Sequence, residues 1–356
     1  MTGKCRKSEG RSLKVEVRRP DGTERMLGLV MSLPDQLAAG AKAACTARIG
    51  RAGKFDAVAV AGMGGSGISA RIVQGLLFDK LSIPVFACND YGIPAAVSAR
   101  TLFVAVSHSG DTEETLSAFA QARRRGCRII AITHGGELGR QASRHGYRVL
   151  SVPGGMPPRA ALGYLFSTLL VCLGRLGVCV SHQRGLAEAV RLMRAQRESW
   201  LVQARTIAEH LGGRLPMVYS TSRMLDAVAD RWRCQLNENA GVLCHTNALP
   251  EHNHNEIVGM GRPRHPGRQN VVIALLDRET RDRTRFRLES VLDITEQTYH
   301  AAIRLEGEGR SRLARVFSLV MLGDLVSVEL ARLLGKDAME IDRIVELKRR
   351  MAQKRG

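Results

Sequence analysis

The sequence predicts an α/β protein built from two doubly wound halves, each a parallel sheet flanked by helices on both faces. Short β-branched or apolar runs alternate with segments of helical period, which is the pattern of strand–helix–strand units. This alternation appears before a long helical stretch in the middle of the chain and again, more weakly, after it. The 356 residues, 44% of them apolar, are comfortable for two domains and can bury a sizeable core.

The first half begins with a polar, basic segment without periodicity. We expect residues 1–25 to form a flexible tail, with order beginning near Met26. A helix is expected from Pro34 onward, because a proline ring is compatible with a helix start but not with a helix interior. The strands expected next are 56–61, 84–88, 102–107, 128–133 and 147–152, and the helices between them are 68–77, 113–125 and 138–144.

The second half repeats this organisation after two connecting helices, which we expect at 160–176 and 185–211. Its expected strands are 216–221, 242–244, 270–276 and 286–292, and its expected helical segments are 223–236, 280–283, 309–334 and 337–353. On this basis, the first subdomain with its connecting helix covers residues 26–184 and the second covers residues 185–356.

Charge and cysteine content limit the classes of partner. Lys and Arg number 53 against 34 Asp and Glu, and this net charge of +19 favours anionic ligands. The charge is spread along the chain and only 4% of residues are aromatic, so we expect no specific nucleic-acid binding. Eight cysteines form no CxxC pair and mostly lie in apolar runs, which is typical of a reducing compartment. No signal-peptide core or bilayer-length apolar run is evident, so we expect a cytoplasmic protein without a membrane partner.

Two predicted strand ends carry glycines and hydroxyl groups. One is Ala57-Val-Ala-Val-Ala-Gly-Met-Gly-Gly-Ser-Gly67 and the other is Ser107-His-Ser-Gly-Asp-Thr112. Each opens into a predicted helix, whose N–H groups and positive dipole end suit a dianionic phosphate. The expected ligand is therefore a phosphorylated small molecule.

Two other interpretations of these loops stay open. Gly62, Gly64 and Gly67 also satisfy G-x-G-x-x-G, with Asp90 about one strand further on, so a nicotinamide dinucleotide site competes. The hydroxyls around Gly110 favour the phosphosugar, because an oxyanion nest of this kind is not required by a dinucleotide. The serines and glycines could also merely form tight turns and helix caps.

Several motifs together resemble the sugar isomerase (SIS) domains and, more closely, the archaeal and bacterial bifunctional phosphoglucose/phosphomannose isomerases. Besides the two loops above, the motifs are Leu33-Pro-Asp-Gln-Leu37, Pro157-Pro-Arg-Ala-Ala-Leu-Gly-Tyr164, Asn237-Glu-Asn239, His254-Asn-Glu256 and Leu347-Lys348. They occur in the right order over about residues 30 to 350. The resemblance implies two SIS-type, flavodoxin-like subdomains and interconversion of glucose 6-phosphate and fructose 6-phosphate, with mannose 6-phosphate as a further substrate. It also implies a place in glycolysis and gluconeogenesis.

The resemblance assigns a role to each site residue. The phosphate is held by Gly65, Ser66, Ser107, Ser109 and Thr112. Glu238 is the base that moves a proton between C2 and C1, which one carboxylate can do in both steps. Arg159 stabilises the enediolate, and His254 and Lys348 open the sugar ring. Similar enzymes are homodimers in which this histidine reaches the neighbouring subunit's site, and neither a cofactor nor a metal is implied.

Competing interpretations of the same residues are plainer. Lys348 on a helix stripe could be a surface residue, and Glu238 could be an exposed carboxylate at a helix end. A zinc site is disfavoured because the spacing of the nearby histidines and cysteines fits no standard site. These residues are His245, His252, His254, His265, Cys234 and Cys244. Two other function classes remain: a non-catalytic SIS-type phosphosugar-binding regulator and a nicotinamide-dependent oxidoreductase.

Three positions depart from the family pattern. The segment 338–341 lacks the threonine or proline found before the Leu-Lys pair in similar enzymes, so glucose 6-phosphate activity is implied more firmly than mannose 6-phosphate activity. His108 and Asp111 replace a frequent tyrosine and asparagine. Asp111 would weaken phosphate binding unless its side chain turns away or caps the following helix.

Overall fold

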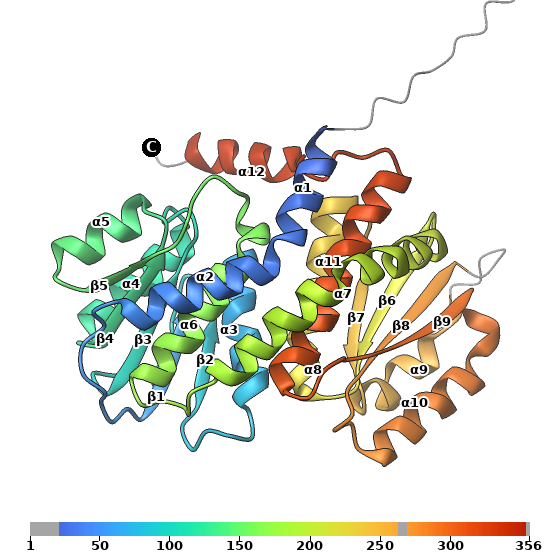
Figure 1. The fold of residues 1–356 in the computed structure, drawn as a ribbon, viewed down its shortest axis with the longest axis horizontal. Coiled ribbons are helices and arrows are strands. Elements are labelled where there is room, and N and C mark those ends of the chain that lie inside the picture. Colours follow the sequence, from blue (N-terminus) through green and yellow to red (C-terminus); the bar gives the residue numbers. More distant parts are fainter. Residues whose placement is uncertain (1–20, 263–268, 354–356) are drawn as a thin grey trace, which may run out of the picture.

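The computed structural model describes residues 21–262 and 269–353. Two parallel sheets lie on either side of a layer of long helices (Figure 1). Within these residues, no helix combines the length and the apolar character that a membrane crossing needs. The seven cysteines in this part of the chain are all free thiols.

The first sheet has five parallel strands in the order β2-β1-β3-β4-β5. Its strands are β1 (Ala57–Ala61), β2 (Val85–Cys88), β3 (Thr101–Val106), β4 (Arg128–Thr133) and β5 (Arg148–Ser151). Every residue of β1 and β3 is buried, as expected for central strands covered on both faces. The helices of this half are α1 (Asp21–Met31), α2 (Leu33–Thr46), α3 (Gly64–Leu77), α4 (Glu113–Arg124), α5 (Gly136–Arg144), the 3₁₀ turn η1 (Pro158–Ala160) and α6 (Leu162–Arg175).

The second sheet has four parallel strands in the order β7-β6-β8-β9, so it repeats the first sheet without a fifth strand. Its strands are β6 (Leu215–Ser220), β7 (His245–Ala248), β8 (Asn270–Leu276) and β9 (Ala301–Glu306). The helices are α7 (Gln183–Leu211), α8 (Arg223–Gln235), the π-helix η2 (Leu236–Ala240), the 3₁₀ turn η3 (Glu251–His254), α9 (Glu256–Gly259), α10 (Asp282–Ile294), the 3₁₀ turn η4 (Glu296–Thr298), α11 (Arg312–Leu333) and α12 (Asp342–Gln353).

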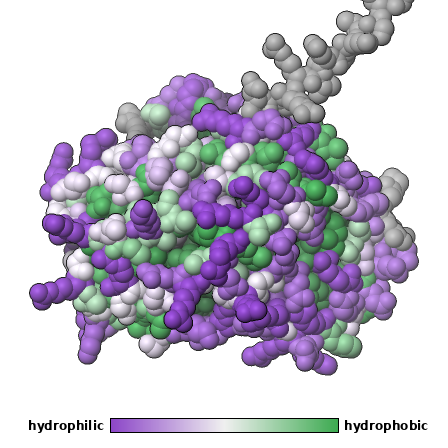
Figure 2. Space-filling model, viewed as in Figure 1, coloured by the Kyte–Doolittle hydropathy of each residue, from purple (hydrophilic) through white to green (hydrophobic). Residues whose placement is uncertain are grey.

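One continuous hydrophobic core joins the two sheets through the central helices. Phe166 of α6 and Phe317 of α11 stack with ring centroids 4.8 Å apart. Trp232 of α8 is fully buried and its indole N–H donates to the Leu319 carbonyl. Hydrophilic side chains are spread widely over the face shown in Figure 2, with hydrophobic residues scattered between them. The two halves are therefore held in a fixed relation, so residues from both can form one site.

Three sequence-based assignments in the second half are wrong. The predicted strand 286–292 lies inside α10, where Leu288, Val291 and Leu292 are buried at helical spacing. The strand predicted at 242–244 lies three residues later, as β7. The strand β9 was not predicted, because its residues are mostly half-exposed and its apolar signal is weak.

Both ends of the described chain also differ from expectation. The helix α1 begins at Asp21, before the predicted onset of order at Met26, while residues 1–20 of the predicted tail lie outside the described residues. The last helix begins at Asp342 rather than at 337. The predicted helical segment 280–283 overlaps only the start of α10, and the remaining predicted strands and helices agree with the structure to within a few residues.

Candidate functional site

The first sheet places both hydroxyl-bearing loops side by side. In the order β2-β1-β3-β4-β5, the direction of winding reverses between β1 and β3, and ligands of open α/β sheets bind in the crevice at this switch point. The loop after β1 leads into α3 and the loop after β3 leads into α4. The two helix N-termini therefore point at the same crevice, which favours an anion there.

Hydrogen bonds connect the two loops and leave hydroxyl protons available. Ser66 Oγ accepts from the backbone N–H of His108 at 3.1 Å, and Ser109 Oγ accepts from the N–H of Asp111 at 3.3 Å. Ser107 Oγ lies 3.0 Å from Thr112 Oγ1. A hydroxyl that accepts such a bond keeps its own proton for an anionic oxygen. The bond from His108 N–H to Ser66 therefore joins the two loops, and the hydroxyls of Ser107, Ser109 and Thr112 are held within the second loop.

Gly65 brings the first loop against the segment that carries Arg159. A Cβ atom at position 65 would lie 2.6 Å from the Pro158 carbonyl oxygen and 2.7 Å from the Arg159 backbone. Such distances exclude any side chain at this position. The loop after β1 and the turn η1 are therefore in direct backbone contact.

The Arg159 guanidinium is held by Asn239 and the Ala338 carbonyl and faces Glu238. Its side chain is only 2% exposed. Its Nε donates to Asn239 Oδ1 at 2.8 Å, and its Nη2 donates to the Ala338 carbonyl at 2.8 Å. Its Nη1 lies 3.5 Å from Glu238 Oε2. Segments about 80 and 180 residues apart in the chain thus fix one guanidinium next to one carboxylate.

Glu238 lies on the π-helix η2, which directly continues α8. π-Helical turns inside α-helices frequently occur at functional sites, because the extra residue redirects a side chain. The π-helix ends at Gly241, which has a φ of +70°, a conformation that favours glycine. The Lys336 ammonium donates to the carbonyls of Glu238 and Asn239 at 3.2 Å and so fixes this end of the helix.

The environment of Glu238 favours proton exchange. Burial raises the pKa of the Glu238 carboxyl above its usual value, while the charges of Arg159, Arg231 and Lys348 partly oppose this shift. Burial also lowers the pKa of Arg159. A guanidinium nevertheless stays charged in proteins. A carboxylate with a raised pKa beside a fixed cation is suited to take up and release a proton.

The structure places the two remaining predicted residues differently. Lys348 is exposed on α12, but its charge acts on Glu238, so α12 passes near the carboxylate. His254 is exposed at the end of η3. No hydrogen bond or ion pair between described residues joins His254 to Arg159, Glu238 or Lys348. Within the described residues, contacts therefore join the first phosphate loop, Arg159 and Glu238, Lys348 is linked to Glu238 through its charge, and His254 has no hydrogen bond or ion pair to this group.

The departures in the second loop are accommodated. The Asp111 carboxylate turns away from the loop and accepts from the backbone N–H of Glu137 at 2.8 Å, so it caps α5 rather than α4. His108 is buried, with Nε2 2.9 Å from the Pro153 carbonyl, and burial lowers its pKa.

Sequence reasoning assigned no role to two residues that support this site, although Asn239 belongs to the motif Asn237-Glu-Asn239. Asn239 bridges Arg159 and Ser327, since its Nδ2 donates to Ser327 Oγ at 2.9 Å. Its position next to Glu238 was a signal that could have identified it. Lys336 had no comparable signal, because its partners are backbone carbonyls.

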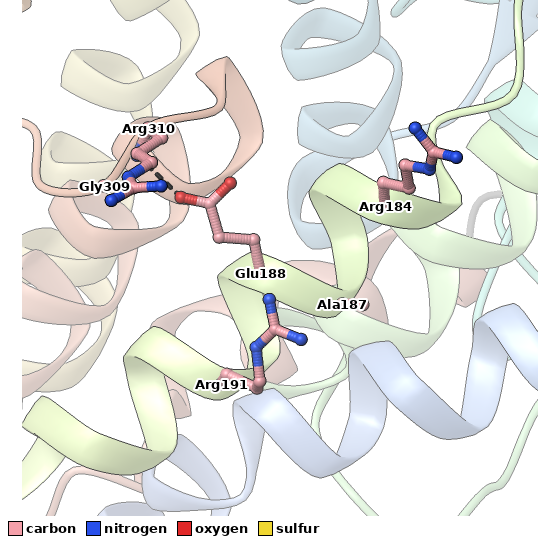
Figure 3. A pocket seen from close by; sticks show the side chains of 6 residues that line it. All are labelled: Arg184, Ala187, Glu188, Arg191, Gly309 and Arg310. Carbon is pink, nitrogen blue, oxygen red and sulfur yellow. Dashed lines mark hydrogen bonds between the residues drawn. The ribbon is translucent and has the colours of Figure 1, made fainter.

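Other candidate sites lie elsewhere. Within residues 21–262 and 269–353, no group of three His, Cys, Asp or Glu side chains could hold a metal ion, and His265 lies outside these residues. A hollow of about 640 Å³ lies between α7 and the loop before α11 (Figure 3). Its lining includes Arg184, Arg191 and Arg310, with Glu188 bonded to the backbone of the loop. None of the predicted site residues lines this hollow.

Comparison with known families divides the chain as the two sheets do. The description "SIS domain" matches residues 55–157, which include the first sheet and both hydroxyl-bearing loops. The description "Bacterial phospho-glucose isomerase C-terminal SIS domain" matches residues 202–351, which include the second sheet, Glu238, His254 and Lys348.

Curated relatives match over most of their length. A bifunctional phosphoglucose/phosphomannose isomerase of Caldicellulosiruptor bescii is 36% identical over 310 residues, covering 85% of this chain and 91% of the relative. A protein of the same name from Thermoplasma acidophilum is 36% identical over 303 residues, covering 85% of this chain and 92% of the relative.

Solved structures share the fold at low sequence identity. A hypothetical protein from Thermus thermophilus superposes with a TM-score of 0.72 at 15% identity, covering 94% of each chain. The C-terminal domain of a glucosamine-fructose-6-phosphate aminotransferase from Francisella tularensis superposes with a TM-score of 0.67 at 14% identity, covering 88% of this chain and 96% of that one. At this identity the likeness supports the architecture alone.

Proposed function

Because the chain belongs to the family of bifunctional phosphoglucose/phosphomannose isomerases, we propose that it interconverts glucose 6-phosphate and fructose 6-phosphate, and also isomerises mannose 6-phosphate. The observation that carries this proposal is the position of Arg159. Its backbone touches the phosphate loop at Gly65 and its guanidinium faces Glu238 at 3.5 Å. Phosphate recognition and proton transfer thus meet at one residue.

The proposed isomerisation uses one base. Glu238 removes the proton from C2 of the open-chain sugar and the electrons form an enediolate with charge on O1. The proton of the C2 hydroxyl moves to O1, the C2 carbonyl forms, and the protonated carboxyl returns its proton to C1. Arg159 stabilises the negative charge that develops on the oxygen atoms. The Nε and Nη2 atoms of Arg159 are hydrogen-bonded to Asn239 and to the Ala338 carbonyl. The guanidinium therefore does not have to change its orientation as the charge develops.

The phosphate is bound by the first switch point. Ser66, Ser107, Ser109 and Thr112 supply hydroxyl donors, and the N-termini of α3 and α4 supply favourable dipoles. This concentration of hydroxyl donors and the family membership both favour the phosphosugar over a nicotinamide dinucleotide.

Ring opening requires His254 and Lys348 as an acid–base pair, and we propose that His254 acts in the partner site of a homodimer. Exposed apolar side chains in the second half support this, because Leu243 and Val258 are 79% and 81% exposed and could be covered by a second subunit. The helix α12 has no buried residue, and its apolar side chains also remain exposed. A second copy of the chain is the proposed occupant of these surfaces.

A coupled assay tests the activity. Fructose 6-phosphate is supplied, and formation of glucose 6-phosphate and mannose 6-phosphate is measured with and without a chelator. We expect turnover that survives chelation, since the proposed steps need only protein groups. Binding of fructose 6-phosphate without turnover would instead support the phosphosugar-binding regulator.

Mixing of two inactive variants tests the dimer. Chains with Glu238→Gln and chains with His254→Ala are unfolded together, refolded and assayed. If His254 acts in the partner site, mixed dimers contain one intact site and activity returns. Mixtures that stay inactive although mixed dimers form would contradict the trans arrangement.

The free thiols support a cytoplasmic location for the enzyme.

A further inference from the structure

His254 lies on a short segment that follows the edge strand of the second sheet. The turn η3 ends at His254 and α9 begins at Glu256. His254 is exposed, whereas the side chains of His252 and Glu256 are only 0% and 16% exposed. The direction in which His254 projects is therefore set by the two inward-facing residues on either side of it.

The Glu256 carboxylate is held by three side chains from the second sheet. Its Oε1 accepts from Tyr219 Oη at 2.6 Å. Its Oε2 lies 2.8 Å from His245 Nε2 and accepts from Asn247 Nδ2 at 2.5 Å. Tyr219 belongs to β6, and His245 and Asn247 belong to β7. We name these four residues the carboxylate clamp.

The carboxylate clamp lowers the pKa of Glu256, which makes this residue unsuitable as a catalytic base. Burial alone would raise the pKa of Glu256, but the hydrogen bonds from His245, Tyr219 and Asn247 lower it to about 2. The hydrogen bond to Glu256 in turn raises the pKa of His245. A carboxylate stabilised in this way stays ionised at neutral pH, so it anchors the segment rather than accepting protons.

Leu249 and Met260, on either side of this segment, pack in the core of the second half, but α9 itself adds little apolar packing. The helix α9 has no buried residue. His252 packs on the Tyr219 ring with centroids 4.7 Å apart, but neither of its ring nitrogens hydrogen-bonds to a described residue. The polar attachment of this segment to the sheet therefore depends strongly on the Glu256 carboxylate.

We propose that Glu256 is a positioning residue, whose carboxylate clamp fixes the orientation of His254 for ring opening. The inference rests on the proposed function, because it assigns Glu256 a part in one step of that reaction. In this step one group removes the O1 proton, another donates a proton to the ring oxygen, and the C1–O5 bond breaks to give the carbonyl.

The test isolates ring opening from isomerisation. In a Glu238→Gln chain, proton transfer between C2 and C1 is blocked, while exchange of the two anomers of glucose 6-phosphate can continue. Magnetisation-exchange NMR on C1-labelled glucose 6-phosphate measures this exchange. We expect the Glu238→Gln protein to catalyse anomer exchange above the uncatalysed rate. The double variant Glu238→Gln/Glu256→Gln should catalyse it about tenfold more slowly, since positioned acid–base groups contribute about 100-fold or more. Equal acceleration by both proteins would overturn the proposal.

Two further variants complete the test. One is a matched control, and the other replaces Glu256→Gln if that variant does not fold. Glu251→Gln removes a carboxylate from the same turn, where Glu251 is exposed and accepts a hydrogen bond from Asn255 rather than from the sheet. We expect this change to leave anomer exchange intact. If Glu256→Gln does not fold, Tyr219→Phe removes one donor and keeps the ring beside His252. It should slow exchange about threefold in the Glu238→Gln background, as expected for loss of one hydrogen bond, and an unchanged rate would overturn the proposal.

The wild-type chain separates the two possible failures. If it does not isomerise fructose 6-phosphate, the proposed function is wrong. If it isomerises normally and the Glu256→Gln single variant has an unchanged kcat, the function stands and the positioning role is wrong. A clamp defect should lower kcat and leave KM nearly unchanged, because the phosphate loops belong to the first sheet.

Discussion

The two sheets have the same strand order around their switch points, but the two crevices are filled differently. At the first, between β1 and β3, serine and threonine hydroxyls surround the N-termini of α3 and α4. At the second, between β6 and β8, Arg315 of α11 is 1% exposed and pairs with Asp277 at 2.5 Å. Thr221 and Thr280 bond to each other at 2.9 Å in the same place.

Topology creates a crevice in each sheet, but the side chains decide whether that crevice can bind a ligand. In the second half, Arg315 donates a hydrogen bond to Asp277. This guanidinium is therefore not available as a donor to a phosphate. The second half contributes instead through Glu238, at the far end of the helix that begins at its switch point. The two halves thus divide binding and proton transfer between them in the proposed reaction.

The largest expected effect is on the base. We expect Glu238→Gln to lower kcat by about 10³- to 10⁴-fold, in the upper part of the range for general base catalysis. Fructose 6-phosphate should still bind, because the phosphate contacts lie in the other half. Stopped assays and calorimetry measure the two quantities. Turnover near the wild-type level would remove Glu238 as the base.

The next effect tests the filled switch point. Asp277→Asn removes the buried carboxylate partner of Arg315 and leaves it only the exposed Glu279 carboxylate, and loss of one partner of a buried pair costs about 3 kcal/mol of unfolding free energy. Denaturant unfolding measures the loss. KM should stay unchanged, and a large rise in KM would mean that the second crevice binds substrate.

A smaller effect is expected at the open switch point. Ser107→Ala removes one hydroxyl of the proposed phosphate site, and a hydrogen bond to a charged group contributes about 1.5–3 kcal/mol. We therefore expect KM for fructose 6-phosphate to rise about 10- to 100-fold, with a smaller change in kcat. Thr280→Ala in the second half is the matched control. Equal KM values for the two variants would break the comparison.

The smallest effect is on the pH profile. Burial raises the pKa of Glu238, and the base acts only when ionised, so kcat/KM should fall on the acid side through a pKa above the ordinary glutamate value of 4.5. Folding stability depends on pH in the opposite direction to kcat/KM. Between the ordinary and the raised pKa the folded chain holds the extra proton, so this group's contribution to stability falls as pH rises. Glu238→Gln should therefore have an equal or higher Tm at neutral pH.

Particular segments explain why most of the fold, but not all of it, was predicted from sequence. The strands β1 and β3 are continuous apolar runs because both of their faces are buried, and such runs are recognisable. The segment 286–292 alternates apolar and charged residues in a way that also suits a helix, and its burial on α10 was decided by packing. The strand β9 pairs only with β8, so its own residues carry a weak signal.

Sequence alone was enough to identify the α/β class, the two loops at the ends of β1 and β3, and the motifs of the family. These features are local, because strand period, turn glycines and helix caps depend on neighbouring residues. The folded chain was needed to show that Arg159 faces Glu238, that Lys336 fixes the end of the π-helix, and that Asp111 caps α5. The reason is that these contacts join segments far apart in the chain, and their partners are often backbone carbonyls and amides that every sequence contains.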